Sequence, residues 1–186
     1  MKNPLLQRGA SLLEVLVAML LLAFGMLALG VMLSFSVQLP KLAGYRATAT
    51  TLASSHIERM RANASELQSP DGAYTAKPLS YNGTFDPIPL ADCSYGDCTP
   101  VKLALMDNAA TQHAVREALP AGGVLVTCDA GTGPCGSASY GNIWIVWQDP
   151  STAAALSPAS PDNCPSQVIQ SYTNPVPHCL YVRFKI

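Results

Sequence analysis

The sequence predicts an α+β protein in which a long N-terminal helix packs on a small antiparallel sheet, with loops crosslinked by disulfides. Three observations predict this class. Residues 11–39 are almost all apolar, residues 42–60 carry apolar side chains at three- or four-residue spacing, and three later segments alternate in polarity. All six cysteines follow the apolar segment. The 49% of apolar residues therefore divides between a rod and a head, and one globular domain is excluded.

The charge composition argues against a nucleic-acid partner. The 186 residues include 11 Lys and Arg against 12 Asp and Glu, a formal net charge of −1. A nucleic-acid-binding protein shows a basic patch or stripe, and this chain has neither in its sequence.

The first element is an apolar segment long enough to cross a membrane. From Val15 to Leu33 no residue has a polar side chain. At 1.5 Å per helical residue this stretch spans about 28 Å, close to the hydrocarbon core of a bilayer. Lys2 and Arg8 precede it, so the positive-inside rule predicts a cytoplasmic N-terminus and a head on the far side of the membrane.

Glu14 is the exception in this segment, because it lies just inside the apolar run. One interpretation is that its carboxylate reaches the cytoplasmic interface and is solvated there. The other is that it has a functional partner, since ionisable groups within a membrane are costly.

The residues around Glu14 resemble the class III signal of type IV prepilins and pseudopilins. A short basic leader ends at Gly9, and residues 10–16 read Ala-Ser-Leu-Leu-Glu-Val-Leu. The resemblance implies that a prepilin peptidase cleaves between Gly9 and Ala10 and N-methylates Ala10. Glu14 would be the fifth residue of the mature chain, paired with the terminal amine of a neighbouring subunit. The departure from the family is Ala10, where Phe is usual, and this puts the efficiency of methylation in question.

The next element is the amphipathic continuation of the rod. Pro40 should kink the helix or mark a bend, because it removes a backbone donor. Beyond it a stripe of apolar and aromatic residues predicts one helical rod over residues 11–63. His56 lies on this stripe, so we expect it to face the core rather than to bind a metal.

The head begins with a connection and a second helix. Residues 63–100 are rich in Pro, Asn-Gly and Asp-Gly, which predicts an irregular connection. Residues 101–119 then repeat apolar side chains at helical spacing, before a Pro-Ala-Gly-Gly stop.

The last elements are three strands. Alternating patterns predict strands over residues 124–128, 140–148 and 179–185. The interval 149–178 contains six prolines and predicts a long loop.

Two segments resemble the minor pilin family of type IV pilus modification protein PilV. One is residues 11–19. The other is Leu-Pro-Ala-Gly-Gly at 119–123, followed by two strands and by Trp144 and Trp147 just before Asp149. The resemblance implies a pilin-like fold and roles in pilus assembly, twitching motility and cell adhesion.

The cysteines predict disulfides, because their number is even and the expected compartment is oxidising. Fifteen pairings are possible, and the simplest is sequential. It would join Cys93 to Cys98, Cys128 to Cys135, and Cys164 to Cys179. A metal site is disfavoured, since the sequence has no Cys-x-x-Cys and no matching histidine spacing.

We therefore expect a minor pilin without enzymatic activity, cofactor or metal. We expect four regions: a leader over 1–9, a transmembrane and filament-core helix over 10–39, an amphipathic half over 40–63, and a periplasmic head over 64–186. The expected partners are prepilin peptidase, major and other minor pilins, the bacterial inner membrane and a tip adhesin. The alternatives are a type II secretion pseudopilin and a membrane-anchored periplasmic binding domain.

Overall fold

The computed structural model describes residues 11–69, 72–75, 88, 92–94, 96–129, 135–136, 139–149, 164–172 and 176–185. The chain divides into two units, residues 1–41 and residues 42–186, which are described separately below. The predicted cleavage residues Gly9 and Ala10 lie outside the described residues.

The helix α1, Leu12–Ala62, contributes to both units. In the first unit its side chains are exposed from Leu12 through Val37, and most of them are large and apolar. The helix continues through Pro40, so this proline does not end it. The loss of one backbone donor is tolerated within a 51-residue helix.

In the second unit, α1 buries one face in the head. Its fully or nearly buried residues follow helical spacing: Ala49, Ala53, His56, Ile57 and Met60. These positions lie on the stripe that the sequence predicts, and the charged Glu58 and Arg61 lie on the exposed side. The amphipathic pattern therefore orients this half of the helix.

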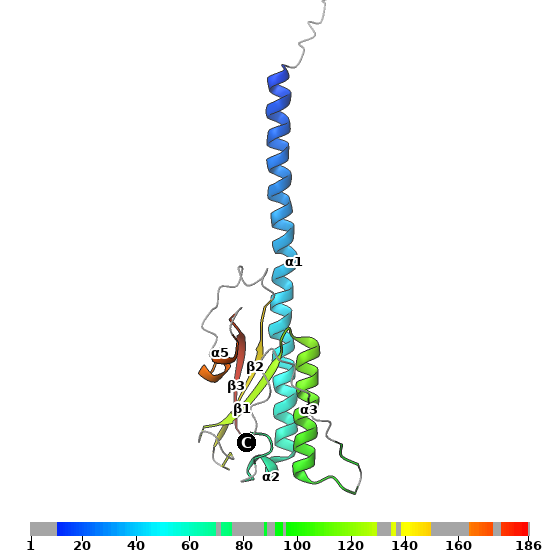
Figure 1. The fold of residues 1–186 in the computed structure, drawn as a ribbon, viewed down its shortest axis with the longest axis vertical. Helices are drawn as coiled ribbons and strands as arrows, with labels where there is room; N and C mark the ends of the chain where they lie inside the picture. Colours follow the sequence, from blue (N-terminus) through cyan, green and yellow to red (C-terminus); the bar gives the residue numbers. More distant parts are fainter. Residues whose placement is uncertain are drawn as a thin grey trace, which may run out of the picture. The chain divides into compact units, whose positions relative to one another are not determined.

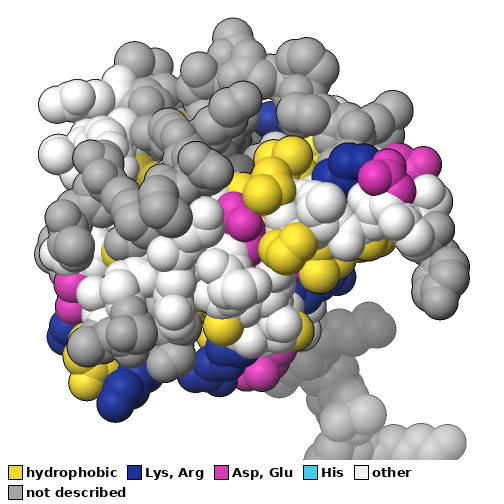
Figure 2. All heavy atoms as spheres, turned by 90° about the horizontal axis from the view of Figure 1, so that it is seen from below, with side chains coloured by type: hydrophobic (Ala, Val, Ile, Leu, Met, Phe, Trp, Pro, Cys, Tyr) yellow, Lys and Arg dark blue, Asp and Glu magenta, His cyan; other side chains and the backbone are white. Residues whose placement is uncertain are grey.

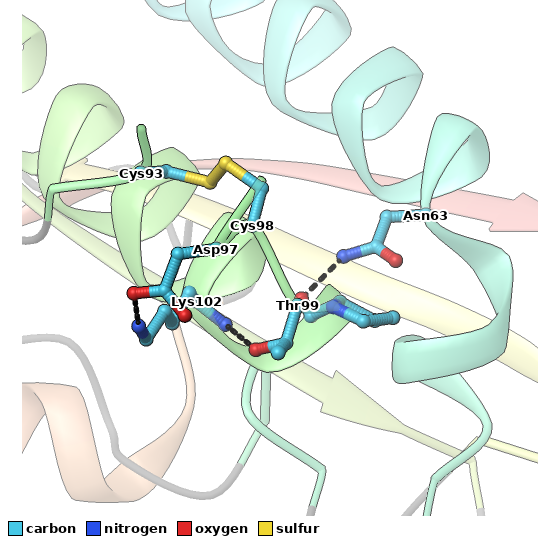
Figure 3. Close-up of a disulfide and its surroundings, with 7 residues drawn as sticks. Asn63, Cys93, Asp97, Cys98, Thr99 and Lys102 are labelled. Atoms are coloured by element: carbon cyan, nitrogen blue, oxygen red, sulfur yellow. Dashed lines mark hydrogen bonds and ion pairs between the residues drawn. A yellow bond between two sulfur atoms is a disulfide. The ribbon is translucent and has the colours of Figure 1, made fainter. Parts of the chain in front are cut away.

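The helix α3, Pro100–Ala118, lies beside α1 in the head (Figure 1). Its start is defined chemically, because Thr99 caps the Lys102 amide through its hydroxyl and Pro100 occupies the first helical position. Figure 3 shows this end of the helix, with the Cys93–Cys98 disulfide next to it and Asn63 donating to the Pro100 carbonyl at 2.8 Å. Asn63, the residue after α1, is thus hydrogen-bonded to the first residue of α3.

The sheet is an antiparallel meander. Its strands β1 (Gly123–Cys128), β2 (Tyr140–Trp147) and β3 (His178–Lys185) neighbour one another in sequence order. The register places Trp144 opposite both Leu125 and Tyr181. Because alternate residues face opposite sides, the register sorts each strand into an inner and an outer face.

The inner face of the sheet meets α1 and α3 in the main core. From the strands this core takes Val124, Val126, Ile143, Ile145, Trp147 and Phe184. Gly141 is required where it lies, because a Cβ there would come within 2.3 Å of the Phe184 ring. The outer face has a smaller core of Leu125, Val146 and Cys179 beneath Val168 and Tyr172.

The connection from α3 to β1 is tight. Ala121 has a φ of 49°, in the left-handed region, and Gly122 follows it. A Cβ on Gly122 would lie 2.4 Å from the Val115 carbonyl oxygen, so only glycine fits. The Leu-Pro-Ala-Gly-Gly segment therefore has a packing role.

Three disulfides join cysteines that are neighbours along the sequence: Cys93–Cys98, Cys128–Cys135 and Cys164–Cys179. The third attaches the segment that contains α5, Ser166–Ser171, to the start of β3. Tyr172 fixes the same segment through a hydrogen bond from its hydroxyl to the Ala121 carbonyl at 2.9 Å.

The predicted fold class is confirmed: a long helix packs through its second half on a three-stranded antiparallel sheet with three disulfides. Two short helices were not predicted, α2 (Ala64–Leu67) and α5. Both lie in segments whose prolines and turn residues predict loops.

Candidate functional site: the start of helix α1 and the polar core of the head

The predicted assembly residue Glu14 lies in the first turn of α1. Its backbone amide donates to the Ser11 carbonyl at 2.9 Å, which makes Ser11 the residue from which the helix starts. The Glu14 side chain is exposed, and all its neighbours on the helix through Leu33 are apolar or glycine. A carboxylate near the helix N-terminus is favourably placed in the field of the helix dipole.

The surface of this half of α1 is apolar on every side. Leu13, Leu16, Leu20, Phe24 and Leu27 are each more than half exposed, and α1 is the one described helix long and apolar enough to cross a membrane. A helix that is apolar all round is stable only in lipid or packed among other helices. The apolar half of α1 therefore suggests membrane anchoring or secretion.

The head contains a polar cluster between α1, α3 and the segment 72–75. Its members are His56, Asn63, Glu66, Tyr74, Asp107, Asn108 and Thr111, all buried. The Tyr74 hydroxyl donates to Asp107 Oδ2 at 2.8 Å, and Asn63 Nδ2 lies 3.3 Å from the Tyr74 oxygen. Buried polar groups are costly unless they are hydrogen-bonded, and these bonds satisfy the Tyr74 hydroxyl and one Asp107 oxygen.

The segment 72–75 is held to α2 and α3 by the same cluster. The Ala73 amide donates to Glu66 Oε1 at 3.1 Å, and Asn108 Nδ2 donates to the Ala73 carbonyl at 2.9 Å. Arg59 adds an ion pair with Asp107 at 3.6 Å. The cluster thus ties three sequence segments together, which is a structural role.

Burial sets the protonation states in this cluster. It lowers the pKa of His56 to about 4, with a smaller contribution from the charge of Arg59. It also raises the pKa of Tyr74, and the hydrogen bond to Asp107 raises it further. Both side chains are therefore neutral at pH 7, which suits a core.

A second buried polar pair, His178 and Asp149, lies where β2 ends and β3 begins. His178 Nε2 is 3.0 Å from Asp149 Oδ2, and both side chains are almost fully buried. The Trp147 and His178 rings stack at 5.9 Å. This pair joins the end of β2 to the start of β3, on either side of the long connection between them.

The sequence patterns predict the burial of His56 but neither of the two buried polar arrangements. No three His, Cys, Asp or Glu side chains gather as a metal site among the residues that the structure describes. All six cysteines are in disulfides. On the face seen in Figure 2, dark blue and magenta side chains lie next to one another, so the described charges there are mixed in sign.

These features define a pilin-like architecture: an apolar N-terminal helix, an amphipathic continuation packed on an antiparallel sheet, and disulfide-bonded loops. In comparisons with known proteins, no family model, no curated protein and no solved structure matches the chain.

Proposed function

We propose that this chain is a minor pilin of a type IV pilus that helps to initiate or cap pilus assembly. The observation that carries the proposal is Glu14, a carboxylate in the first turn of α1, directly before the stretch from Val15 to Leu33 that has no polar side chain. The sequence before it, a basic leader ending at Gly9, supports cleavage by prepilin peptidase between Gly9 and Ala10. Methylation of the new Ala10 terminus would follow.

The chemistry of assembly explains why a carboxylate is needed there. In a filament the apolar halves of the helices pack together without water, and an unpaired charge in that environment is costly. The terminal amine of Ala10 on a neighbouring subunit supplies the opposite charge. Pairing it with Glu14 neutralises both groups and also sets the axial register between subunits.

The same features support a location in the bacterial inner membrane before assembly. The apolar half of α1 is the one candidate span in the described part of the chain, Lys2 and Arg8 favour a cytoplasmic N-terminus, and the disulfides suit a periplasmic head. Within this proposal the partners are prepilin peptidase, the major pilin, other minor pilins and a tip adhesin, and the head has no catalytic role.

Expression with and without prepilin peptidase tests the processing step. With active peptidase, intact-mass analysis should show a chain beginning at Ala10. A terminus at Met1 or Lys2 under these conditions would refute the pilin proposal and favour a membrane-anchored binding domain.

Substitution of Glu14 tests the assembly step. Glu14→Gln should be cleaved normally but should reduce surface pili strongly, because its uncharged amide cannot neutralise the terminal amine. Glu58→Gln is the matched control, since Glu58 is an exposed carboxylate on the same helix within the head. Normal piliation in Glu14→Gln would contradict the pairing role.

A deletion strain separates the pilus from a type II secretion pseudopilus, which shares the same processing. Loss of surface fibres with normal enzyme export is the expected result. Loss of export with normal fibres would assign the chain to the secretion system.

A further inference from the structure

The outer face of the sheet carries three aromatic rings that are partly or largely exposed: Tyr140, Trp144 and Tyr181. The smaller outer core beneath α5 covers one end of this face, and Trp144 packs against its edge. The other end carries a group of aromatic and polar side chains that we name the outer platform: Asp129, Tyr140, Asn142, Trp144, Tyr181 and Arg183. Tyr140 is 40% exposed and Tyr181 is 38% exposed.

The rings of the platform are held in fixed positions. Trp144 and Tyr181 lie opposite each other on β2 and β3, and their rings stack at 5.1 Å with an angle of 29°. The Arg183 guanidinium lies 4.2 Å from the centre of the Tyr140 ring. Ring stacking and cation–π contact on a paired sheet leave these side chains little rotational freedom.

A chain of hydrogen bonds connects the rings. The Tyr181 hydroxyl donates to Asn142 Oδ1 at 2.7 Å, and Asn142 Nδ2 donates to Asp129 Oδ1 at 2.8 Å. Arg183 then pairs with Asp129 Oδ2. These two contacts, with the Asn142 bond as the larger cause, lower the pKa of Asp129, so the carboxylate is ionised at neutral pH.

We propose that the outer platform is a carbohydrate-binding site for a neutral pyranose unit. The C–H bonds on one face of a pyranose ring carry partial positive charge and pack against the negative face of an aromatic ring. The edge of the sugar carries hydroxyl groups that both donate and accept. The platform supplies a carboxylate acceptor in Asp129 and a guanidinium donor in Arg183 within the same few residues.

The arrangement favours a neutral sugar over a charged ligand. Asp129 and Arg183, the two charged members of the platform, neutralise each other, and the charge of Lys185 lies outside the platform at its rim. It also favours a sugar over a proline-rich peptide, which presents only carbonyl acceptors. The Tyr181 hydroxyl already donates to Asn142, and a carboxylate repels carbonyl oxygens. The proposal is independent of the proposed pilus role.

Titration of the full chain in a zwitterionic detergent without a sugar headgroup tests this site, since glycoside detergents would compete. The probes are methyl β-D-glucopyranoside, methyl β-D-galactopyranoside, cellobiose and N,N′-diacetylchitobiose, with sorbitol as the acyclic control. We expect saturable binding of at least one probe by calorimetry, with a change in tryptophan fluorescence. Trp147 is 2% exposed in the main core, so the change would report Trp144.

Variants locate the binding. Trp144→Ala and Tyr181→Ala should each weaken binding by about tenfold or more, and Trp144→Phe should restore part of the affinity. Leu105→Ala is the control, because Leu105 is an exposed apolar residue on α3, whose buried residues join the inner core. Thermal unfolding of each variant establishes that the head remains folded.

Several outcomes would overturn the proposal. These are no saturable binding of any pyranoside, equal binding of sorbitol, or unchanged affinity in a folded Trp144→Ala variant. Preferential binding of N-acetylneuraminic acid would show that charge, not the ring face, is recognised. Saturable binding of a decaproline peptide in place of the sugars would identify the platform as a peptide site.

Discussion

His56 is a neutral histidine in a buried polar cluster. Its Nδ1 lies 2.8 Å from the Thr111 hydroxyl, and its buried Nε2 has no hydrogen-bond partner among the residues that the structure describes. Protonation would place a charge next to Arg59 in a site that excludes water. The fold therefore favours the neutral imidazole and is sensitive to acid at this residue.

The free energy of unfolding of the head should decrease as the pH is lowered, because of His56. Its pKa is about 4 in the folded state against 6.5 in the unfolded state, so the unfolded state binds the proton more tightly. The stability that depends on the neutral form is fully present above about pH 6.5. It is lost as the pH falls towards 4, to a total of about 3 kcal/mol. Urea unfolding of the detergent-solubilised chain between pH 7.5 and pH 4 measures this slope.

The control is a histidine outside the cluster. His56→Gln should flatten the slope between pH 6.5 and pH 4, and it should also lower stability at neutral pH because the site is packed. His113→Gln should leave the slope unchanged, because His113 is exposed on α3. An unchanged slope in His56→Gln would show that another group causes the acid sensitivity.

Residue patterns predict which side chains are buried better than they predict which partners they meet. The burial of His56 follows from its place on the helical stripe. The bond between Tyr74 and Asp107 does not, because 33 residues separate them and neither position belongs to a periodic pattern that orients both. Pairing of this kind depends on how the segment 72–75 returns to the helices.

At the level of elements, the boundaries of the strongly periodic segments were predicted to within one or two residues. The helices α1 and α3 and all three strands fall in this group, because hydrophobic periodicity is a local property with a clear physical cause. The short helices α2 and α5 have four and six residues, too few to show a period. Of the predicted functional residues, Glu14 is placed by the structure in the first turn of α1, while Gly9 and Ala10 lie outside the described residues.

The connection between α3 and β1 should be intolerant of even one added methyl group. Gly122→Ala would place a Cβ 2.4 Å from the Val115 carbonyl oxygen, and a backbone atom within a helix cannot easily move away. We expect a loss of about 3 kcal/mol or more in the free energy of unfolding. Urea unfolding followed by tryptophan fluorescence would measure it.

A glycine in open space provides the matched control. Gly44 lies in α1, and a Cβ there would meet no atom within 4 Å. Gly44→Ala should therefore leave the head unchanged or stabilise the helix by about 0.5–1 kcal/mol. Equal effects of the two substitutions would contradict the packing argument for Gly122.

For the whole molecule, the two units differ in how much of their apolar surface is buried. The apolar half of α1 is exposed from Leu12 through Val37 and forms no core of its own. The head has a main core, an outer core and three crosslinks. The low proportion of charged residues in the chain, 12%, agrees with this division, because the apolar half of α1 contributes many apolar residues and almost no charge.

The disulfides should contribute unequally to the stability of the head. Cys164–Cys179 closes a 15-residue loop, whereas Cys93–Cys98 closes a five-residue loop whose Cys98 is exposed. Replacing the first pair by alanine should cost about 3 kcal/mol, and replacing the second about 2 kcal/mol or less. Equilibrium unfolding of both double variants under oxidising conditions measures the difference. Equal losses would show that loop length and packing do not control the effect.

The pairing of neighbouring cysteines has a consequence for biogenesis. The three bonds join cysteines 5, 7 and 15 residues apart, and their loops do not overlap along the chain. If the N-terminus stays in the cytoplasm and the head crosses the membrane in sequence order, each thiol meets its native partner soon after both have crossed. Oxidation can then proceed in order of emergence, without reshuffling of long-range mispairs. The first two disulfides can thus form before β3, which completes both cores, has crossed.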